Sequence, residues 1–206
     1  QPITFKVTDE AGGSGIDLST LTFKIDNTTC KYDSAGMTKT NIANGYQFVY
    51  APQTALTDGE HTVTINVSDH DGNAAATYTF KFKVDTVPPT LTITAPTNNL
   101  ITNKKALTLT GKTNDATSSP VIVTATLNGK SIGAITVGTD GAFTKAITAT
   151  EGSNTLVVTA KDSAGKATTV TVTFKVDTSV PVVKSATITP NPVNASASVQ
   201  IVLEIE

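Results

Sequence analysis

The sequence contains no arginine and no tryptophan, so its 15 basic residues are all lysines. Base and phosphate recognition relies on the guanidinium group, and single-strand binding relies on aromatic side chains among basic residues. The formal net charge of −2 supplies no basic excess. These absences predict that nucleic acid is not a partner of this chain.

Cysteine and long apolar runs are equally scarce. Cys30 is the single cysteine, so no disulfide can form within the chain and no cysteine-based metal site can be assembled. No run of about 18 apolar residues occurs, so we expect no membrane contact by this fragment. The chain opens on Gln1 without a charged and then apolar leader, which suggests a piece excised from a longer protein.

The pentapeptide FKVDT occurs twice, at Phe82–Thr86 and Phe174–Thr178, and 174 minus 82 gives a spacing of 92 residues. Prolines follow both copies and stiffen the linkers. Recurrence at this spacing predicts one structural unit used repeatedly. The expected domains are residues 1–86, 87–178 and 179–206, the last being the truncated start of a third unit.

Apolar and polar residues alternate strictly in nearly every segment, which is typical of strands with one buried face. Ile3, Phe5 and Val7 alternate with threonine and lysine, and Leu156, Val158 and Ala160 do the same in the second unit. Threonine is abundant, and valine, isoleucine and phenylalanine add to this preference for strands. The pattern predicts an all-β fold with two packed β-layers in each unit.

Turn signals separate these runs. Asn128-Gly129 predicts a two-residue type I′ hairpin, because both residues tolerate positive φ. Residues 139–141 predict the next turn. Asp69–Asn73 and Asp162–Lys166 occupy equivalent positions before the two FKVDT strands, so we interpret them as homologous turns.

About seven short strands in 90 residues match the expectation for an immunoglobulin-like sandwich. The stretches DGEHTVTINVSDHDGN and YTFKFKVD in the first unit resemble the ends of many bacterial Ig-like repeats. LNGKSIG and DGAFTKAITATEGSNTLVVTAKDSAGK in the second unit resemble them too. The resemblance covers essentially the whole chain and implies tandem Ig-like sandwiches in an extended arrangement.

This resemblance implies a structural role outside the cell. Such repeats occur in surface adhesins, secreted polysaccharide-active enzymes and phage tail proteins, so we expect an extracellular, cell-surface or virion location. The leading hypothesis is a spacer or stalk module whose partners are neighbouring domains of the parent chain. The alternatives are an adhesive module that binds carbohydrate or a host protein, and an accessory domain of an extracellular enzyme.

The two ends suggest a further partner. Ile3–Thr8 corresponds to residues 106–111 of the second unit, so the first unit is expected to lack its first strand. Residues 179–206 are expected to form two strands around residues 190–192. The bare edge of the first unit is therefore predicted to be exposed, or filled by strand exchange with a neighbouring copy.

Two motifs match catalytic patterns only formally. Residues 129–133 read G-x-S-x-G, but that pattern needs a strand-to-helix turn and a later histidine, whereas both histidines come earlier. The GKS within these residues lacks the first glycine of a phosphate-binding loop, because Thr124 stands there. We therefore expect no enzyme activity, no catalytic residue and no cofactor-binding residue.

Candidate metal sites are judged by comparing the spacing of acidic residues along the sequence with that of known metal-binding loops. Asp69, Asp71 and Asn73 open like an EF-hand loop, but the twelfth position is Phe80, and tight turns prefer Asp and Asn anyway. The alternative places Asp85 or Asp177 beside one of three turn acids to hold an ion between domains. Those acids are Asp9, Glu10 and Asp17. We expect no metal site.

The remaining polar candidates receive structural interpretations. His61 shares a strand face with Val63 and is expected to be partly buried, and His70 lies in a turn. Cys30 is expected to be unreactive. Residues 27–50 form a long segment, expected to be irregular, that lacks a counterpart in the second unit, so this segment is the predicted place for a contact surface.

Overall fold

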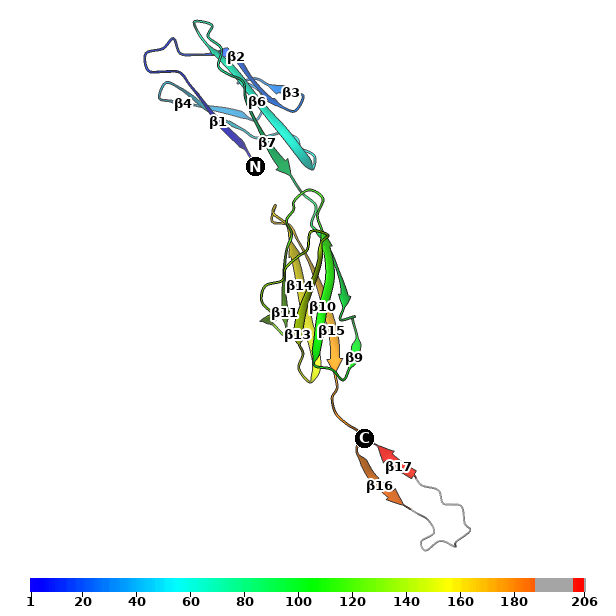
Figure 1. Cartoon of the computed structure of the whole chain (residues 1–206). Helices are drawn as coiled ribbons and strands as arrows, with labels where there is room; N and C mark the ends of the chain where they lie inside the picture. The colour runs from blue at the N-terminus through cyan, green and yellow to red at the C-terminus, as the bar shows by residue number, and fades with distance from the viewer. Residues whose placement is uncertain (188–201, 206) are drawn as a thin grey trace, which may run out of the picture. The chain divides into compact units, whose positions relative to one another are not determined.

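The computed structural model describes residues 1–187 and 202–205. Strands joined by turns make up these residues, and none of them lies in a helix (Figure 1). The all-β expectation is therefore confirmed. In this described part of the chain no helix is long and apolar enough to cross a membrane.

The chain forms two compact units, each described here by itself. The first comprises residues 1–90 together with two shorter segments, 113–122 and 160–168. The second comprises residues 91–112, 123–159 and 169–206.

The first unit contains two antiparallel sheets. One has the order β1-β5-β4 and the other β3-β2-β6-β7. Their bounds are β1 Ile3–Thr8, β2 Ile16–Ile25, β3 Thr28–Cys30, β4 Met37–Ile42, β5 Gly45–Tyr50, β6 Gly59–Asp69 and β7 Tyr78–Val84. The alternation seen in the sequence is the alternation of the pleat, because Phe5 and Val7 face inward while Thr4 and Lys6 face water.

Aromatic rings fill the space between these two sheets. Phe5 on β1 stacks on Phe23 of β2 and on Phe48 of β5, with ring centroids 5.1 Å apart in both pairs. Tyr50 adds a tilted contact to Phe23 at 5.2 Å. Phe23 and Phe48 are fully buried, so the two layers are joined by offset aromatic stacking.

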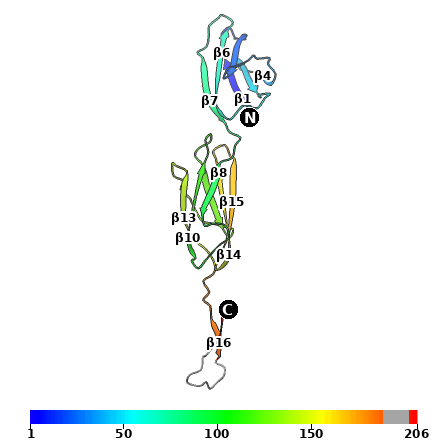
Figure 2. The ribbon, with the colours of Figure 1, turned by 90° about the vertical axis from the view of Figure 1, so that its right-hand side faces the viewer.

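Two further facing sheets lie mainly in the second unit, although the ends of several of their strands belong to the first unit as divided above (Figure 2). Their orders are β13-β10-β8 and β12-β11-β14-β15-β9. The bounds are β8 Thr90–Ala95, β9 Leu100–Thr102, β10 Ala106–Asn114, β11 Ile122–Leu127, β12 Lys130–Ser131, β13 Ala142–Thr148, β14 Gly152–Lys161 and β15 Ala167–Val176. Its interior is mainly aliphatic, with Leu109, Leu156, Val158 and Val176 fully buried.

One edge distinguishes the two units. In the second, β8 flanks β10, and β9 pairs in parallel with β15. In the first, β1 pairs with β5, and within the described residues no strand lies along its other side. A groove of about 740 Å³ opens there, lined by Phe5, Val7, Ile65, Tyr78 and Phe80 among others.

The last described strands, β16 (Val183–Thr187) and β17 (Val202–Ile205), pair as an antiparallel ribbon. The expected two strands are thus present, although the prolines expected between them lie outside the described residues. Val180 and Val182 are exposed just before this ribbon, and Val183 is exposed at its first position.

Residues 27–50 are more regular than the sequence suggested, and the expectation of an irregular segment was wrong. They contain β3, β4 and β5, with β4 and β5 forming a hairpin in continuous register from Met37↔Tyr50 to Ile42↔Gly45. Asn44 takes a positive φ of 58° at its turn. The strand β4 was hidden because it lies on a sheet edge, where four of its six residues are exposed and the apolar alternation is lost.

Candidate functional site

The residue that ends each FKVDT pentapeptide closes a small hydrogen-bonded clamp. Thr86 donates its backbone N–H to Asp58 Oδ1 at 2.9 Å and its hydroxyl to Asp58 Oδ2 at 3.0 Å. Asp58 precedes β6 and Thr86 follows β7. A single carboxylate therefore ties the departing chain to the β-hairpin that it leaves.

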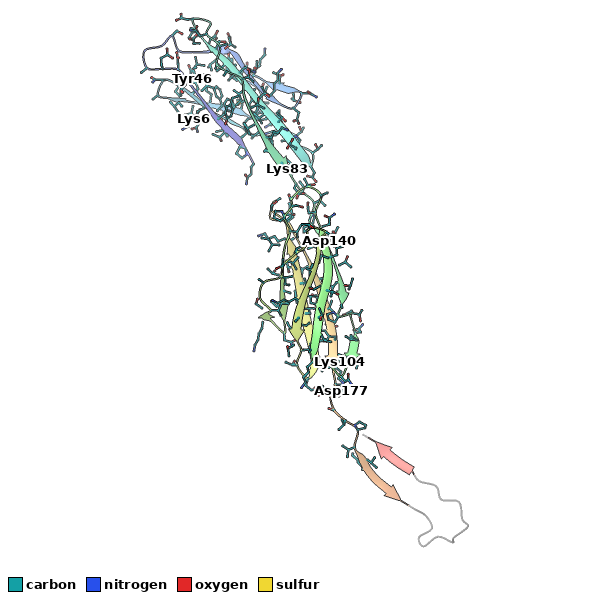
Figure 3. The ribbon with its side chains drawn as sticks, in the orientation of Figure 1. Lys6, Tyr46, Lys83, Lys104, Asp140 and Asp177 are labelled. Carbon is teal, nitrogen blue, oxygen red and sulfur yellow. The ribbon has the colours of Figure 1, made fainter. Side chains whose placement is uncertain are left out.

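The second repeat has the same clamp with one residue type changed. Thr178 donates its N–H to Glu151 Oε1 at 2.9 Å and its hydroxyl to Glu151 Oε2 at 2.6 Å. The hydroxyl and N–H of Thr178, with Lys105 nearby, hold the pKa of Glu151 below its ordinary value. We call these two arrangements the exit clamps. Figure 3 shows Asp177, which comes immediately before Thr178, at the end of β15.

The residues between the clamps and the following prolines are also fixed locally. Asp85 Oδ1 accepts a hydrogen bond from Val87 N at 3.1 Å, and Asp177 Oδ1 accepts one from Ser179 N at 3.1 Å. The FKVDT repeat thus encodes two recurring devices, an aspartate that caps the turn after it and a threonine that clamps the exit. Sequence analysis found the repeat but not these contacts, because Asp58 and Glu151 lie 28 and 27 residues from their threonines.

The motif at residues 129–133 lies on the β11–β12 hairpin. Asn128 and Gly129 have φ values of 51° and 77°, which confirms the expected positive-φ turn. Ser131 lies on β12 and its hydroxyl accepts the N–H of Gly133 at 3.2 Å. The local structure is therefore not the strand-to-helix turn that a nucleophilic serine needs.

The two turns that were interpreted as homologous have the same hydrogen bonds. Asp69 N donates to Asn73 O at 3.1 Å, and Asp162 N donates to Lys166 O at 3.0 Å. The first carboxylate of each turn accepts the N–H four residues on, at 2.8 Å in both cases. These contacts account for the turn length that the two repeats share, without an ion at Asp71 or Asn73.

His61 is buried on β6 and has two acceptors. Its Nδ1 lies 2.8 Å from Asp26 Oδ2, and its Nε2 lies 2.7 Å from Thr57 O. Because an imidazole bonds two acceptors best when both nitrogens carry hydrogen, Asp26 and Thr57 raise the pKa of His61 above its ordinary value. Asp26, whose pKa is lowered by Thr62 N–H and His61, is the partner that spacing alone did not identify.

Cys30 is a buried free thiol on β3. Its neighbourhood is the aromatic core, where its contact with Tyr50, followed by burial, raises the pKa of the Tyr50 hydroxyl. This placement fits the expectation of an unreactive cysteine, since reactive thiols need a partly exposed, electropositive setting.

The hairpin of β4 and β5 contributes to a shallow hollow of about 300 Å³ at one end of the first unit. Asp9, Glu10, Asn41, Asn44 and Tyr46 are among its lining residues. On the same hairpin the Lys39 ammonium lies 4.8 Å from the centre of the Tyr46 ring. Figure 3 labels Tyr46 on this unit. The hollow therefore combines an aromatic ring with amide and carboxylate groups.

Asp85 has a set of neighbours that the sequence did not indicate. None of the acids that the alternative interpretation placed beside it, Asp9, Glu10 and Asp17, belongs to this group. Asp115 and Asp162 do, with one oxygen of each carboxylate within 4.8 Å of the others. Asp115 escaped notice because it lies in a loop with no motif around it.

Comparison with known proteins places these observations in a family context. Residues 28–86 match the model of a bacterial Ig-like domain, and residues 89–178 match the model of glucodextranase domain B. No curated protein sequence matches the chain.

Solved structures resemble the fold at low sequence identity. The crystal structure of Rst D1-D2 is 14% identical with a TM-score of 0.50, covering 86% of this chain and 92% of that chain. The fibronectin(III)-like modules of Clostridium thermocellum CbhA are 19% identical with a TM-score of 0.45, covering 86% of each chain. A tetra-tandem repeat from the extending region of a large adhesion protein is 19% identical with a TM-score of 0.40, covering 84% of this chain and 46% of that chain.

The two matching family models lie one after the other along the chain, and both units are all-β with facing sheets. The chain is thus a tandem of all-β, Ig-like sandwiches, within which residues 28–86 match the bacterial Ig-like domain family.

Proposed function

We propose that this chain is a structural spacer module of a modular bacterial protein that acts outside the cell. The exit clamps carry this proposal, because the same two hydrogen bonds recur after both FKVDT strands. A carboxylate that binds both the N–H and the hydroxyl of one threonine limits the directions in which the chain can leave the sandwich. The prolines that follow restrict φ in the same segment.

A spacer needs stable, self-contained domains and limited hinge motion rather than a reactive cleft. Each unit buries its own apolar residues, and the exposed faces of the strands carry mainly threonine and lysine. The match to glucodextranase domain B supports a related role as an accessory module beside a catalytic domain elsewhere in a parent chain.

The test is a distance distribution between two spin labels. Thr40 and Thr144 are exposed and can be replaced by cysteine in a Cys30→Ser background. We expect a narrow distribution in this background and a broader one after Asp58→Ala, which removes one exit clamp. The matched control is Asp33→Ala, an exposed acid for which we expect no change. Equally broad distributions with and without the clamp would contradict the spacer role.

The hollow beside Tyr46 supports a second candidate function, carbohydrate binding. Sugars pack on aromatic rings, bond to side-chain amides and donate their hydroxyl hydrogens to carboxylates, and the hollow offers all three groups. Glycan-array binding that is lost in Tyr46→Ala and kept in Tyr32→Ala would favour this function. If the intact chain binds no glycan, the carbohydrate-binding function is contradicted and only the spacer function is retained.

We also propose that the open groove of the first unit accepts an extended strand from a second copy of this chain. Segment 180–187 suits the groove because its exposed valines need cover and the groove is lined by apolar residues. Sedimentation equilibrium should show concentration-dependent dimers that Val183→Lys weakens. A strictly monomeric chain at high concentration would overturn the exchange.

A further inference from the structure

Three carboxylates converge at one place in the first compact unit. Asp85 follows β7, Asp115 lies in segment 113–122, and Asp162 begins the turn after β14. One oxygen from each lies within 4.8 Å of the other two. In the described part of the chain this is the single group of three or more such side chains with metal-ligand spacing.

The backbone positions each of these carboxylates through one oxygen. In all three residues Oδ1 accepts backbone N–H groups at 2.7–3.1 Å. The donors are Val87 for Asp85, Thr117 and Ser118 for Asp115, and Lys166 for Asp162. The two loops are joined as well, since Ser163 N donates to Ser118 O at 3.2 Å. Backbone N–H groups therefore fix the position of each of the three carboxylates.

Two of the remaining oxygens are buried and have no hydrogen-bond partner. They are Asp85 Oδ2 and Asp162 Oδ2. Asp162 is 5% exposed and Asp115 is 9% exposed, so water reaches them poorly. Lys81, Lys105 and Lys175 pair with other acids, namely Glu60, Glu151 and Asp177. Buried carboxylates this close repel each other and lose hydration, so they require a compensating positive charge.

Equivalent residues elsewhere in the chain have partners. Asp69 begins the homologous turn of the first repeat, and its Oδ2 accepts the side-chain amide of Asn73 at 2.8 Å. Asp177 is the aspartate of the second FKVDT, and its half-exposed carboxylate lies 3.9 Å from Lys175 Nζ. The turn alone therefore does not leave an aspartate oxygen unpartnered. Among the described residues, a buried side-chain oxygen without a hydrogen-bond partner occurs only at Asp85 and Asp162.

The donor set selects the kind of ion. The group contains carboxylate oxygens and no histidine or cysteine, which favours a hard cation over zinc or copper. Calcium binds oxygens at about 2.3–2.6 Å, so ligands on opposite sides of it are about 5 Å apart, and it tolerates irregular geometry. Magnesium at about 2.1 Å requires a tighter octahedron. We propose that Asp85, Asp115 and Asp162 form a calcium-binding site.

The test first removes bound metal from the full chain with a chelator. The chain is then titrated with calcium, and the heat of binding is measured by isothermal calorimetry. We expect one calcium ion per chain, with weaker heat from magnesium. Asp162→Asn keeps the bond from Lys166 N but loses the charge, and should weaken calcium binding at least tenfold. Asp177→Asn is the matched control and should bind as the unchanged chain does. When calcium is bound, the amide hydrogens of loops 113–122 and 160–168 should exchange with solvent more slowly than in its absence.

If a variant binds no calcium, its melting temperature in the presence of chelator shows whether it is still folded. Without calcium, Asp162→Asn should melt at or above the temperature of the unchanged chain, because one repelling charge is gone. If Asp162→Asn melts at a much lower temperature, it is misfolded, and the calcium titration is repeated with Asp85→Asn. No heat and no shift in melting at millimolar calcium would overturn the site, as would equal losses in Asp162→Asn and Asp177→Asn. The exit clamps contain none of these three residues, so failure here leaves the spacer role standing.

Discussion

The two repeats solve the same packing problem with different chemistry at one turn, where an exposed turn residue bonds to a buried strand residue. In the first, Asp26 and His61 form a pair that joins the β2–β3 turn to β6. In the second, Asn128 and Asn154 take the equivalent places, with Nδ2 of Asn128 donating to Oδ1 of Asn154 at 2.9 Å. An ionisable pair in one repeat therefore corresponds to a neutral amide pair in the other.

The backbone around these pairs is nearly identical. Asp26 and Asn128 have φ values of 52° and 51°. Asp26 Oδ1 accepts the N–H of Thr62, and Asn128 Oδ1 accepts the N–H of Thr155, both at 2.8 Å. The turn thus requires a short side chain that tolerates positive φ and offers an oxygen, and both Asp and Asn meet this requirement. Once that geometry is satisfied, the side chain at this position can be charged, as in Asp26, or neutral, as in Asn128.

The largest expected effect comes from breaking the neutral pair. Asn154 is 1% exposed and bonds the carbonyl oxygens of Thr150 and Gly152. Asn154→Ala leaves these buried groups unpaired, so we expect the second repeat to lose about 2–3 kcal/mol of stability. Hydrogen exchange measured by mass spectrometry should show faster exchange in residues 91–176 only. The exposed Asn103→Ala serves as the control, and an equal effect from it would contradict the assignment.

A change of pH should alter the stability of the two repeats differently, and this effect should be smaller than that of Asn154→Ala. The pKa of His61 is raised above its ordinary value of 6.5 by Asp26 first and then Thr57. Its stabilising contribution is therefore complete below about pH 6.5 and is lost as the pH rises through the higher pKa of the folded state. Calorimetry should show the first transition falling by a few degrees toward alkaline pH, while the second, which contains no histidine, stays constant over that interval.

Two histidine variants sharpen this comparison. His61→Asn copies the residue of the second repeat and should remove the pH dependence of the first. His70→Asn changes the exposed turn histidine and should preserve it. A scan that is unaltered in His61→Asn would show that the buried pair does not control the transition.

The smallest effect is expected at the exit clamps. Thr86→Val and Thr178→Val each remove one hydroxyl bond to an exposed carboxylate, so each should cost about 0.5–1 kcal/mol. Thr86→Ser and Thr178→Ser should retain that stability in thermal melting. Because the clamp holds the pKa of Glu151 below its ordinary 4.5, the second clamp is complete above that pH and weakens as the pH falls further. Equal melting of the Val and Ser variants would contradict a stabilising clamp.

The sequence predicted most of the fold because its signals are local. Alternation along Ile3–Thr8 and Gly152–Lys161 marks inward faces, and Asn128-Gly129 marks a hairpin, each within a few residues. The strand β4 was missed because an edge strand with both faces wet carries no alternation. The short parallel strand β9 was missed for a related reason, since three residues are too few to show a period.

The site residues were less predictable because their contacts are distant in sequence. Asp26 and His61 are 35 residues apart, and Thr86 is 28 residues from Asp58. Asp115 has neither a motif nor a repeated neighbour, yet it lies beside Asp85 and Asp162. Repetition of FKVDT indicated where a conserved device would be found. It did not indicate which side chains complete that device.

The parallel pairing of β9 with β15 bears on how the second repeat would carry tension. Leu100–Thr102 lies near the start of this repeat and Phe174–Val176 lies at its end, in the register Phe174↔Leu100 to Val176↔Thr102. Opposite pulls on the two ends of this domain would load these rungs together in shear, instead of peeling them open one at a time. Because forced unfolding is governed by the unfolding rate, this short parallel pair would slow the extension of the second repeat under load.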